Sequence, residues 1–163
     1  MLDVDRDYCV IIRSNRYITY RKERPDLNTK EVLIGQIYMM AFRGDGSAQN
    51  GLRPGIVIQN NRGNKYSPNV IAIPLTSVLK KRGQPTHVFI PKGIGLSRNS
   101  IALCENPTTV PKADIREYIA TLPEDLMKQV AEAYTLSTPM ISFLNLEEVA
   151  LLLEQSKTMN VVA

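Results

Sequence analysis

Arg53 and Thr76 are the residues of this chain whose types and positions best suit chemistry on an anion. Arg53 and Pro54 stand directly before the apolar run 55–59, and Thr76 follows the apolar run 69–75. A guanidinium group is always charged and matches a phosphate with a planar fork of donors. A threonine hydroxyl can donate and accept. If the two runs are neighbouring strands, both groups meet at one sheet end, where they can stabilise a phosphodiester as it becomes pentavalent.

Such a site needs no metal if the substrate brings its own nucleophile. RNA does so, because its 2′-hydroxyl can be positioned in line with the leaving oxygen. The spacing alone also leaves a simpler alternative open. In that alternative Arg53 is a solvated residue flanking a strand and Thr76 only caps a strand end.

Other catalytic machinery is largely missing from the sequence. His87 is the only histidine, and there is no G-x-S-x-G nucleophile elbow. Cys9 and Cys104 show no metal-ligand spacing, and Asp45 stands alone in its loop. The sequence therefore gives no support for a histidine-triad hydrolase, a zinc site or a carboxylate-cluster nuclease. We interpret His87 as a strand residue with a satisfied ring, the alternative to a catalytic histidine, and we expect neither a metal nor a cofactor.

The composition indicates an ordinary globular domain. The chain has 163 residues, 44% of them hydrophobic, and a net charge of +4 that mildly favours an anionic partner. It contains no apolar run near the ~18 residues of a membrane span and no signal-peptide core at its start. Together with the two cysteines, these features lead us to expect a cytoplasmic protein without a membrane partner.

Short β-rich runs separated by glycine and proline predict a compact β-barrel. Runs 55–59 and 69–75 are continuously apolar, as in strands buried on both faces. Pro68 and Pro74 bracket the second run and favour an edge strand or the end of a ladder there. The predicted strands are a possible hairpin within 8–22, then 32–43 interrupted at Gly35, 55–59, 69–75, 86–90 and 100–105.

Two helices are predicted in the C-terminal third. Thr121 and Glu124 have the spacing of a capping box, with Pro123 in the first turn, and Asn145 and Glu148 repeat that spacing. The first helix has apolar residues at helical spacing, namely Leu126, Met127, Val130, Ala131 and Tyr134.

The blocks GSAQNGLRPGIVIQN and SPNVIAIPLTS, followed by PTHVFI, SIALCE and PEDLMKQVAEA, resemble the MazF/PemK family of bacterial toxin endoribonucleases. The resemblance extends over about residues 35–143 without a sizeable gap. It implies a mainly β fold with C-terminal helices, a small SH3-like barrel, that forms a homodimer. It also implies a toxin of a type II toxin–antitoxin system, inhibited by a cognate antitoxin protein. The activity implied is metal-independent, sequence-specific cleavage of single-stranded RNA (mRNA), leaving a 2′,3′-cyclic phosphate and a 5′-hydroxyl.

The resemblance also implies site residues. The family's essential arginine and threonine fall on Arg53 and Thr76, which would stabilise and orient the scissile phosphate. Small and amide side chains in the loop 44–51 can recognise unstacked bases by their edges. The RNA-binding residues implied are Gly46, Ser47, Gln49, Gln59, Asn60, Ser67 and Glu105. For Gln59, Asn60 and Ser67 the alternative is that they only shape the turn between two strands, and for Ser47 and Gln49 it is loop solubility.

The chain departs from the family pattern in two places. Gln36 stands where the family has an aspartate, and Asn106, Pro107 and Thr108 replace a family segment that ends in arginine. The missing arginine bears on base recognition more than on cleavage.

We divide the chain into an N-terminal extension (1–31), a MazF/PemK-like barrel domain (32–144) and a C-terminal helical extension (145–163). Two alternatives to a free ribonuclease remain at this stage. One is a non-catalytic protein of the same fold that binds a protein or DNA. The other is an autoregulated enzyme in which the N-terminal hairpin is a built-in inhibitor.

Overall fold

The computed structural model describes residues 8–13, 16–21, 31–44, 50–78 and 83–161. Within these ranges no helix has the length and apolar character needed to cross a membrane. The strands are β1 (Tyr8–Arg13), β2 (Arg16–Arg21), β3 (Gln36–Phe42), β4 (Gly51–Val57), β5 (Asn69–Thr76), β6 (His87–Ile90), β7 (Ser100–Leu103), β8 (Thr108–Pro111) and β9 (Ile115–Thr121). The helices are α1 (Asn61–Tyr66), α2 (Glu124–Ser137) and α3 (Leu146–Asn160), with 3-10 turns η1 (Lys92–Ile94), η2 (Lys112–Asp114) and η3 (Met140–Phe143).

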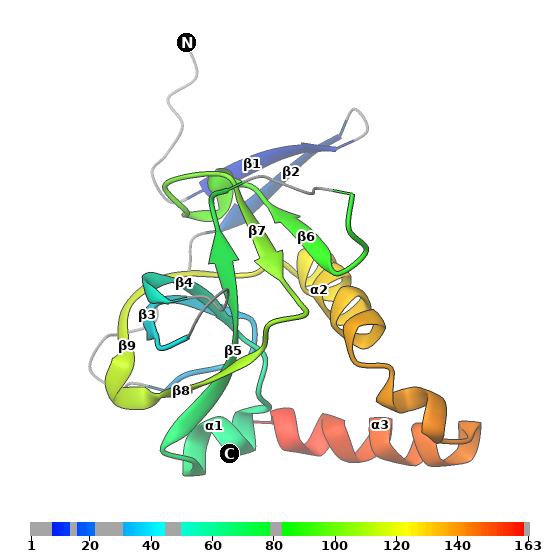
Figure 1. Cartoon of the computed structure of the whole chain (residues 1–163). Coiled ribbons are helices and arrows are strands. Elements are labelled where there is room, and N and C mark those ends of the chain that lie inside the picture. Colours follow the sequence, from blue (N-terminus) through cyan, green and yellow to red (C-terminus); the bar gives the residue numbers. More distant parts are fainter. Residues whose placement is uncertain (1–7, 14–15, 22–30, 45–49, 79–82, 162–163) are drawn as a thin grey trace.

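The main sheet is antiparallel and barrel-like (Figure 1). Its strands follow the order β6-β7-β5-β4-β3-β9, and β8 also pairs with β5. The chain passes from β8 through η2 directly into β9, so the two ends of the path β9-β3-β4-β5-β8 are consecutive in sequence. Among the described residues, the strand pairs do not close the sheet into a complete cylinder. The predicted mainly β fold with C-terminal helices is confirmed.

Strand β5 is an inner strand, so the predicted edge position is wrong. It pairs with β4 on one side and, on the other, with β8 through Asn69–Ala72 and then with β7 from Leu75. Pro74, which has no N–H to donate, stands at this change of partner. The ladder between β4 and β5 also ends at Pro74. The other prediction from the two prolines, the end of a ladder, is therefore confirmed.

Both faces of the sheet are covered, as the continuous apolar runs predicted. Ile56 and Val57 are adjacent in β4 and fully buried in different clusters. The first cluster lies between the sheet and α2 and includes Ile56, Leu126 and Val130. The second cluster includes Val57 and Phe42 and draws on β3, β4, β5, β8 and β9. The pocket described below therefore lies at the end of strands that are buried on both faces.

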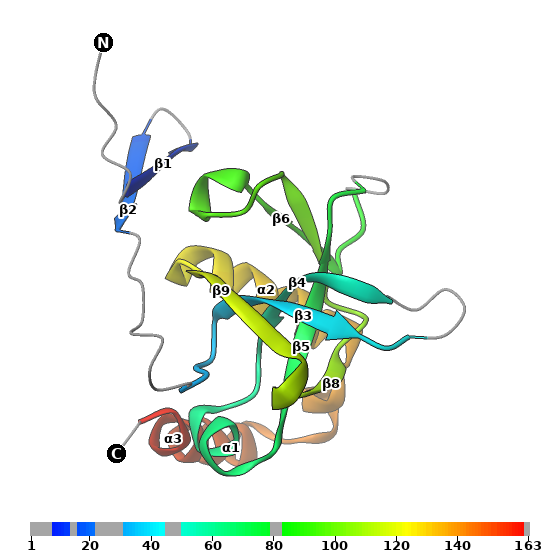
Figure 2. The same ribbon diagram turned by 90° about the vertical axis from the view of Figure 1, so that its left-hand side faces the viewer.

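Helix α1 was not predicted, because the sequence between β4 and β5 contains turn residues and no apolar periodicity. Asn60 nevertheless caps this helix by accepting a hydrogen bond from the Gly63 amide at 2.8 Å. The helix joins the end of β4 to the beginning of β5 and lies beside α3 (Figure 2). There the side chain of Asn61 donates to the carbonyl of Asn160 at 2.9 Å.

The two C-terminal helices exist, but only one capping prediction is confirmed. Thr121 still belongs to β9, its hydroxyl contacts the Tyr118 hydroxyl at 2.9 Å, and Pro123 is the residue that caps α2. The predicted capping box at Thr121 is wrong, because strand pairing extends up to that residue. Asn145 and Glu148 do form the reciprocal capping box of α3. The predicted N-terminal hairpin is also present as the β1–β2 pair.

Candidate active site at the ends of β4 and β5

Arg53 and Thr76 lie at matching positions on two adjacent antiparallel strands. The ladder between β4 and β5 ends with the pair Gly55 and Pro74. Arg53 is two residues before Gly55 and Thr76 is two residues after Pro74, so the same register sets them opposite each other. Residues two apart on a strand point to the same face, and so do opposed residues. Both side chains therefore belong to one face of the sheet.

These two residues line the same surface pocket, which has a volume of about 350 Å³. This volume is at the lower end of the ~300–1,000 Å³ range of small-molecule sites. Leucine, proline and valine side chains form its apolar wall. The polar residues that line it are Arg53, Thr76, Ser77, Ser97, Arg98 and Ser100. The pocket thus combines two cations and several hydroxyl groups with an apolar surface, which suits a ligand that carries both an anionic and an apolar part.

Arg53 is held within β4 rather than before it. It pairs with Met40 of β3 and is half-buried. One of its terminal nitrogens donates to the carbonyl oxygen of Asn50, at the start of the strand. Gly51 takes a positive φ of 88° between them, which favours glycine there. The guanidinium is thereby oriented by the backbone that enters β4.

Thr76 has one side-chain hydrogen bond that fixes its hydroxyl group. Its Oγ1 accepts from the Val78 amide at 3.2 Å. This contact agrees with the alternative in which Thr76 caps the end of its strand. The oxygen acts as acceptor in that bond, and a hydroxyl also has a hydrogen to donate. On the other side of β5, Thr76 pairs with Ile101 of β7. A phosphate oxygen in the pocket can therefore receive a hydrogen bond from an ordered threonine.

Glu105 lies outside the lining of this pocket and is paired with a histidine. Its Oε1 is 2.9 Å from Nε2 of His87, and its side chain is 35% exposed. The histidine side chain is only 8% exposed. Because the histidine is buried, its contact orients the more exposed carboxylate of Glu105. The arrangement gives His87 a contact consistent with a satisfied strand residue, the alternative to a catalytic histidine.

Gln59, Asn60 and Ser67 gather around α1, which is at the opposite ends of β4 and β5 from Arg53 and Thr76. Gln59 donates to the Asn69 carbonyl at 3.2 Å, and the Ser67 hydroxyl accepts from the Asn69 amide at 3.1 Å. Asn60 is the helix cap. These contacts agree with the alternative in which the three residues shape the turn between the strands.

The predicted base-recognition loop falls mostly outside the described residues. Gly46, Ser47 and Gln49 belong to the range 45–49, which the structure does not describe. The loop begins after β3 and returns at Asn50, whose carbonyl Arg53 contacts. The connection places the ends of this loop beside the pocket.

The two departures from the family pattern have clear local structures. Gln36 is 4% exposed, and its Oε1 accepts from the Tyr38 hydroxyl and the Leu33 amide, both at 2.7 Å. A neutral amide oxygen thus serves as the acceptor at a position where a carboxylate was expected. Thr108 donates to the Asn106 carbonyl at 3.2 Å and begins β8.

Arg98 is the pocket residue that the sequence did not single out. It lies in the loop between η1 and β7, in a segment with neither strand nor helix periodicity. Only the pairing of β7 with β5 brings this loop beside Thr76. A basic residue followed by a short apolar strand was the only available signal, and such a signal is common.

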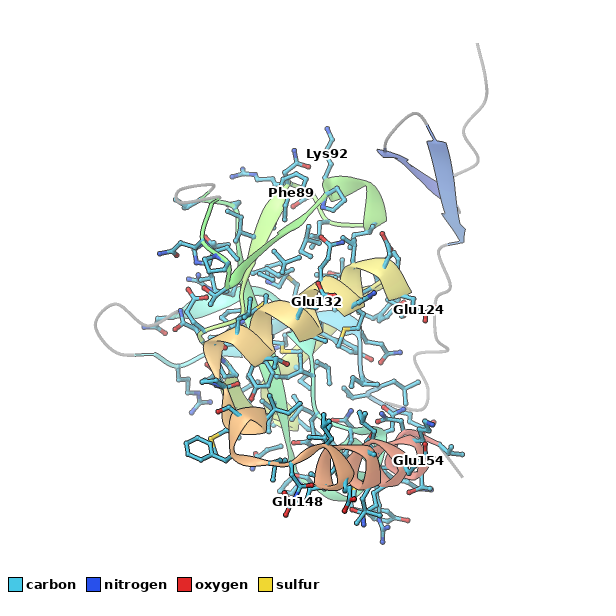
Figure 3. All side chains as sticks on the ribbon, turned by 90° about the vertical axis from the view of Figure 1, so that its right-hand side faces the viewer. Phe89, Lys92, Glu124, Glu132, Glu148 and Glu154 are labelled. Carbon is cyan, nitrogen blue, oxygen red and sulfur yellow. The ribbon has the colours of Figure 1, made fainter. Side chains whose placement is uncertain are left out.

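Four exposed glutamates lie on the C-terminal helices, which do not line the pocket. Figure 3 shows Glu124 and Glu132 along α2 and Glu148 and Glu154 on α3. All four are exposed. These glutamates place negative charge on α2 and α3, whereas two arginines line the pocket. Among the described residues, no group of three His, Cys, Asp or Glu side chains could hold a metal ion.

Comparison with known proteins agrees with these features. Residues 34–137 match the family model described as PemK-like, MazF-like toxin of type II toxin-antitoxin system. This segment contains the sheet from β3 onward, the pocket and all of α2. The chain belongs to this family. The predicted MazF/PemK relationship is thus confirmed.

Several relatives of this MazF/PemK-family protein are known. Endoribonuclease EndoA of Bacillus subtilis (strain 168) is 39% identical over 99 residues, which cover 60% of this chain and 85% of EndoA. The crystal structure of MazF from Deinococcus radiodurans has a TM-score of 0.61 at 23% identity and covers 69% of this chain and 100% of that one. A MazE–MazF structure from the same organism has a TM-score of 0.57 at 24% identity. The match covers 69% of this chain and 99% of that one. At these identities the two solved structures establish the shared fold.

Proposed function

We propose that this MazF/PemK-family protein is an endoribonuclease that cleaves single-stranded RNA, mRNA in particular, at specific short sequences and without a metal ion. The observation that carries the proposal is the meeting of Arg53 and Thr76 in one pocket through the register of β4 and β5. The similarity to EndoA, an endoribonuclease by name, supports the same activity.

In the proposed reaction the RNA 2′-oxygen attacks the adjacent phosphorus. A bond forms between O2′ and phosphorus, and the bond between phosphorus and O5′ breaks. The 2′-hydroxyl loses its proton and the departing 5′-oxygen gains one, so the products are a 2′,3′-cyclic phosphate and a 5′-hydroxyl. Arg53 stabilises the charge that grows on the non-bridging oxygens, and Thr76 donates a hydrogen bond that orients the phosphate.

We assign sequence recognition to the loop that follows β3 and to Glu105. In the loop, Gly46, Ser47 and Gln49 present small and amide groups to unstacked bases. The carboxylate of Glu105, oriented by His87 at 2.9 Å, accepts from a base amino group. For Gln59, Asn60 and Ser67 the contacts around α1 support a structural role, and RNA binding by these three stays a prediction.

The proposed partners are a second copy of the chain and a cognate antitoxin protein. An exposed apolar group formed by Met140, Ile141 and Phe143 follows α2, and these side chains are 69%, 49% and 80% exposed. Apolar side chains gathered in this way favour contact with another protein chain. One of the Deinococcus structures is of MazE with MazF, which supports an antitoxin as partner. We assign catalysis to the domain 32–144 and treat 1–31 and 145–163 as extensions.

The test is cleavage of single-stranded RNA by the purified chain beside the Arg53→Ala variant. We expect cuts at recurring short sequences with the wild type and none with the variant. Cuts by both proteins, or by neither when both are folded, contradict the assignment. For the partners, light scattering of the purified chain is expected to give the mass of a dimer, and a monomer at micromolar concentration contradicts it.

A further inference from the structure

The pocket contains a second arginine that the proposed cleavage step does not use. Arg98 lines it together with Ser97 and Ser100, in the loop that enters β7 beside Thr76. Arg98 is exposed, and among the described residues it forms no ion pair. A cation without a carboxylate partner in a pocket suited to a polyanion is available to a second phosphate.

The backbone of this loop is fixed from both sides. The hydroxyl of Ser100, a residue that is 5% exposed, donates to the carbonyl oxygen of Arg98 at 3.1 Å. On the other side, the amide of Lys92 donates to Oδ1 of Asn99 at 3.0 Å. Ser100 is itself paired with Ile90 in the β6–β7 ladder. Arg98 is thus presented by ordered backbone.

Strand register sets where Arg98 stands relative to the reacting phosphate. Thr76 pairs with Ile101, and the two strands are antiparallel, so the residues after Thr76 run beside the residues before Ile101. Arg98 is therefore on the side of the pocket beyond Thr76, whereas Arg53 approaches from β4. If Arg53 and Thr76 bind one phosphate of an RNA chain, Arg98 is placed to bind the next phosphate of that RNA chain.

We propose that Arg98 forms a second phosphate subsite, which binds the RNA phosphodiester adjacent to the scissile one and fixes the register of the strand. This inference rests on the proposed ribonuclease function. Arg98 is a binding and positioning residue. Its charge contributes to affinity equally before and during the reaction, so it affects Kd more than the cleavage rate of bound RNA.

The experiment measures binding and cleavage separately. The binding probe is a short single-stranded RNA that spans one cleavage sequence mapped with the wild type, with a 2′-deoxy sugar at the nucleotide whose hydroxyl would attack. Its Kd is measured by fluorescence anisotropy between about 50 and 200 mM salt, where phosphate contacts are most visible. Arg98→Ala, Arg98→Lys and Arg116→Ala are compared with the wild type. Arg116 is an exposed arginine of β9 that does not line the pocket.

For Arg98→Ala we expect Kd to rise about tenfold and the slope of log K against log salt to fall by about 0.7, the loss of one phosphate contact on a single strand. The rate at saturating cleavable RNA stays within about threefold of the wild type, since Arg53 and Thr76 are intact. Arg98→Lys retains the salt slope and recovers part of the affinity, because a point charge replaces a fork. Arg116→Ala changes neither quantity.

An unchanged Kd and salt slope in folded Arg98→Ala overturns the subsite while leaving the ribonuclease proposal intact. A large loss of rate at saturating RNA with Kd unchanged also overturns it, because Arg98 would then act on the reacting phosphate. If the wild type cuts no RNA, the proposed function fails. The salt slope on an unmodified mixed-sequence RNA then decides whether Arg98 binds phosphate at all.

Discussion

The register of the β4–β5 ladder sets Arg53 and Thr76 opposite each other, two residues beyond its last pair, Gly55 and Pro74. The two residues are distant in sequence, and the ladder that aligns them contains Gly55 and Pro74 as a pair. A shift of this register by one residue would turn one of the two side chains to the other face of the sheet. The proposed chemistry therefore depends on strand pairing as much as on the two residues themselves.

Replacing Arg53 by alanine is expected to lower the cleavage rate by about 100-fold to 1,000-fold, the usual effect of removing one preorganised donor to a transition-state anion. Unfolding by urea should be unchanged, because the side chain is half-buried and outside both core clusters. Arg116→Ala is the matched control and should retain full activity. A rate for Arg53→Ala equal to that of the control removes Arg53 from the active site.

Thr76→Val keeps the shape of the side chain and removes the hydroxyl. We expect the cleavage rate at saturating RNA to fall by about 10-fold to 100-fold, since one oriented donor to the phosphate is lost. Thr76→Ser keeps the Val78 contact and the donor, and should retain most activity. Thr109→Val, at an exposed position of β8, controls for the loss of a threonine hydroxyl elsewhere. Equal rates for the two valine variants would mean that Thr76 only caps its strand.

Gly55 is required because the ring of Phe42 packs against its backbone. A Cβ atom at this position would lie 2.6 Å from Cζ of Phe42, whose side chain is 1% exposed. Gly55→Ala should therefore lower the free energy of unfolding by about 1–3 kcal/mol through overpacking. Gly83→Ala, where a Cβ meets no atom within 4 Å, should change it by less than about 1 kcal/mol. Urea denaturation of both variants measures this difference, and equal stabilities would contradict the packing.

Tyr38 gives the fold a dependence on alkaline pH. Burial, and then the charge of Tyr118, raise the pKa of Tyr38 from 10.0 to about 12. The unfolded chain loses this proton near pH 10 while the folded chain keeps it, so the stability contributed is complete below pH 10 and is lost as pH rises toward about 12. The free energy of unfolding of Tyr38→Phe should decline less over that pH interval. At neutral pH this variant should be less stable than the wild type by about 1 kcal/mol, because its hydrogen bond to Gln36 is lost. If the free energy of unfolding, measured with urea, falls equally with pH in the wild type and in Tyr38→Phe, the raised pKa is contradicted.

Cys104 should be chemically inert in the folded protein. It is fully buried, and burial together with the neighbouring Glu105 raises the pKa of its thiol to about 12. A thiolate is the reactive form, so very little is present at neutral pH. In a Cys9→Ser background, a thiol reagent should modify Cys104 only after denaturant is added. Rapid modification of the native protein would show that the β7 end of the core opens readily.

Much of the fold follows from local sequence patterns, and the exceptions depend on pairing between distant segments. The runs around Ile56 and Ile73 predicted buried strands correctly because each is apolar on both faces. The edge position assigned from Pro74 failed because β5 exchanges β8 for β7 at that residue, which no local pattern indicates. Helix α1 was missed because asparagine is common both in turns and at helix N-caps, and the segment after Asn60 has no apolar periodicity.

The site divides in the same way. Arg53 and Thr76 were identified from residue type and family resemblance, and the structure brings them together in the pocket. Arg98 was missed because its loop has no motif, and its place beside Thr76 exists only through the β5–β7 ladder.

The most direct test of the central claim is to incubate the purified chain with a long single-stranded RNA in EDTA and to map the ends of every product, beside Arg53→Ala and Arg116→Ala. We expect cuts at a few recurring short sequences, with 2′,3′-cyclic phosphate and 5′-hydroxyl ends, from the wild type and Arg116→Ala alone. Cuts that disappear in EDTA would contradict the proposed mechanism. No cuts by a well-folded protein on several varied RNAs would contradict the function and indicate a binding protein that keeps only the fold.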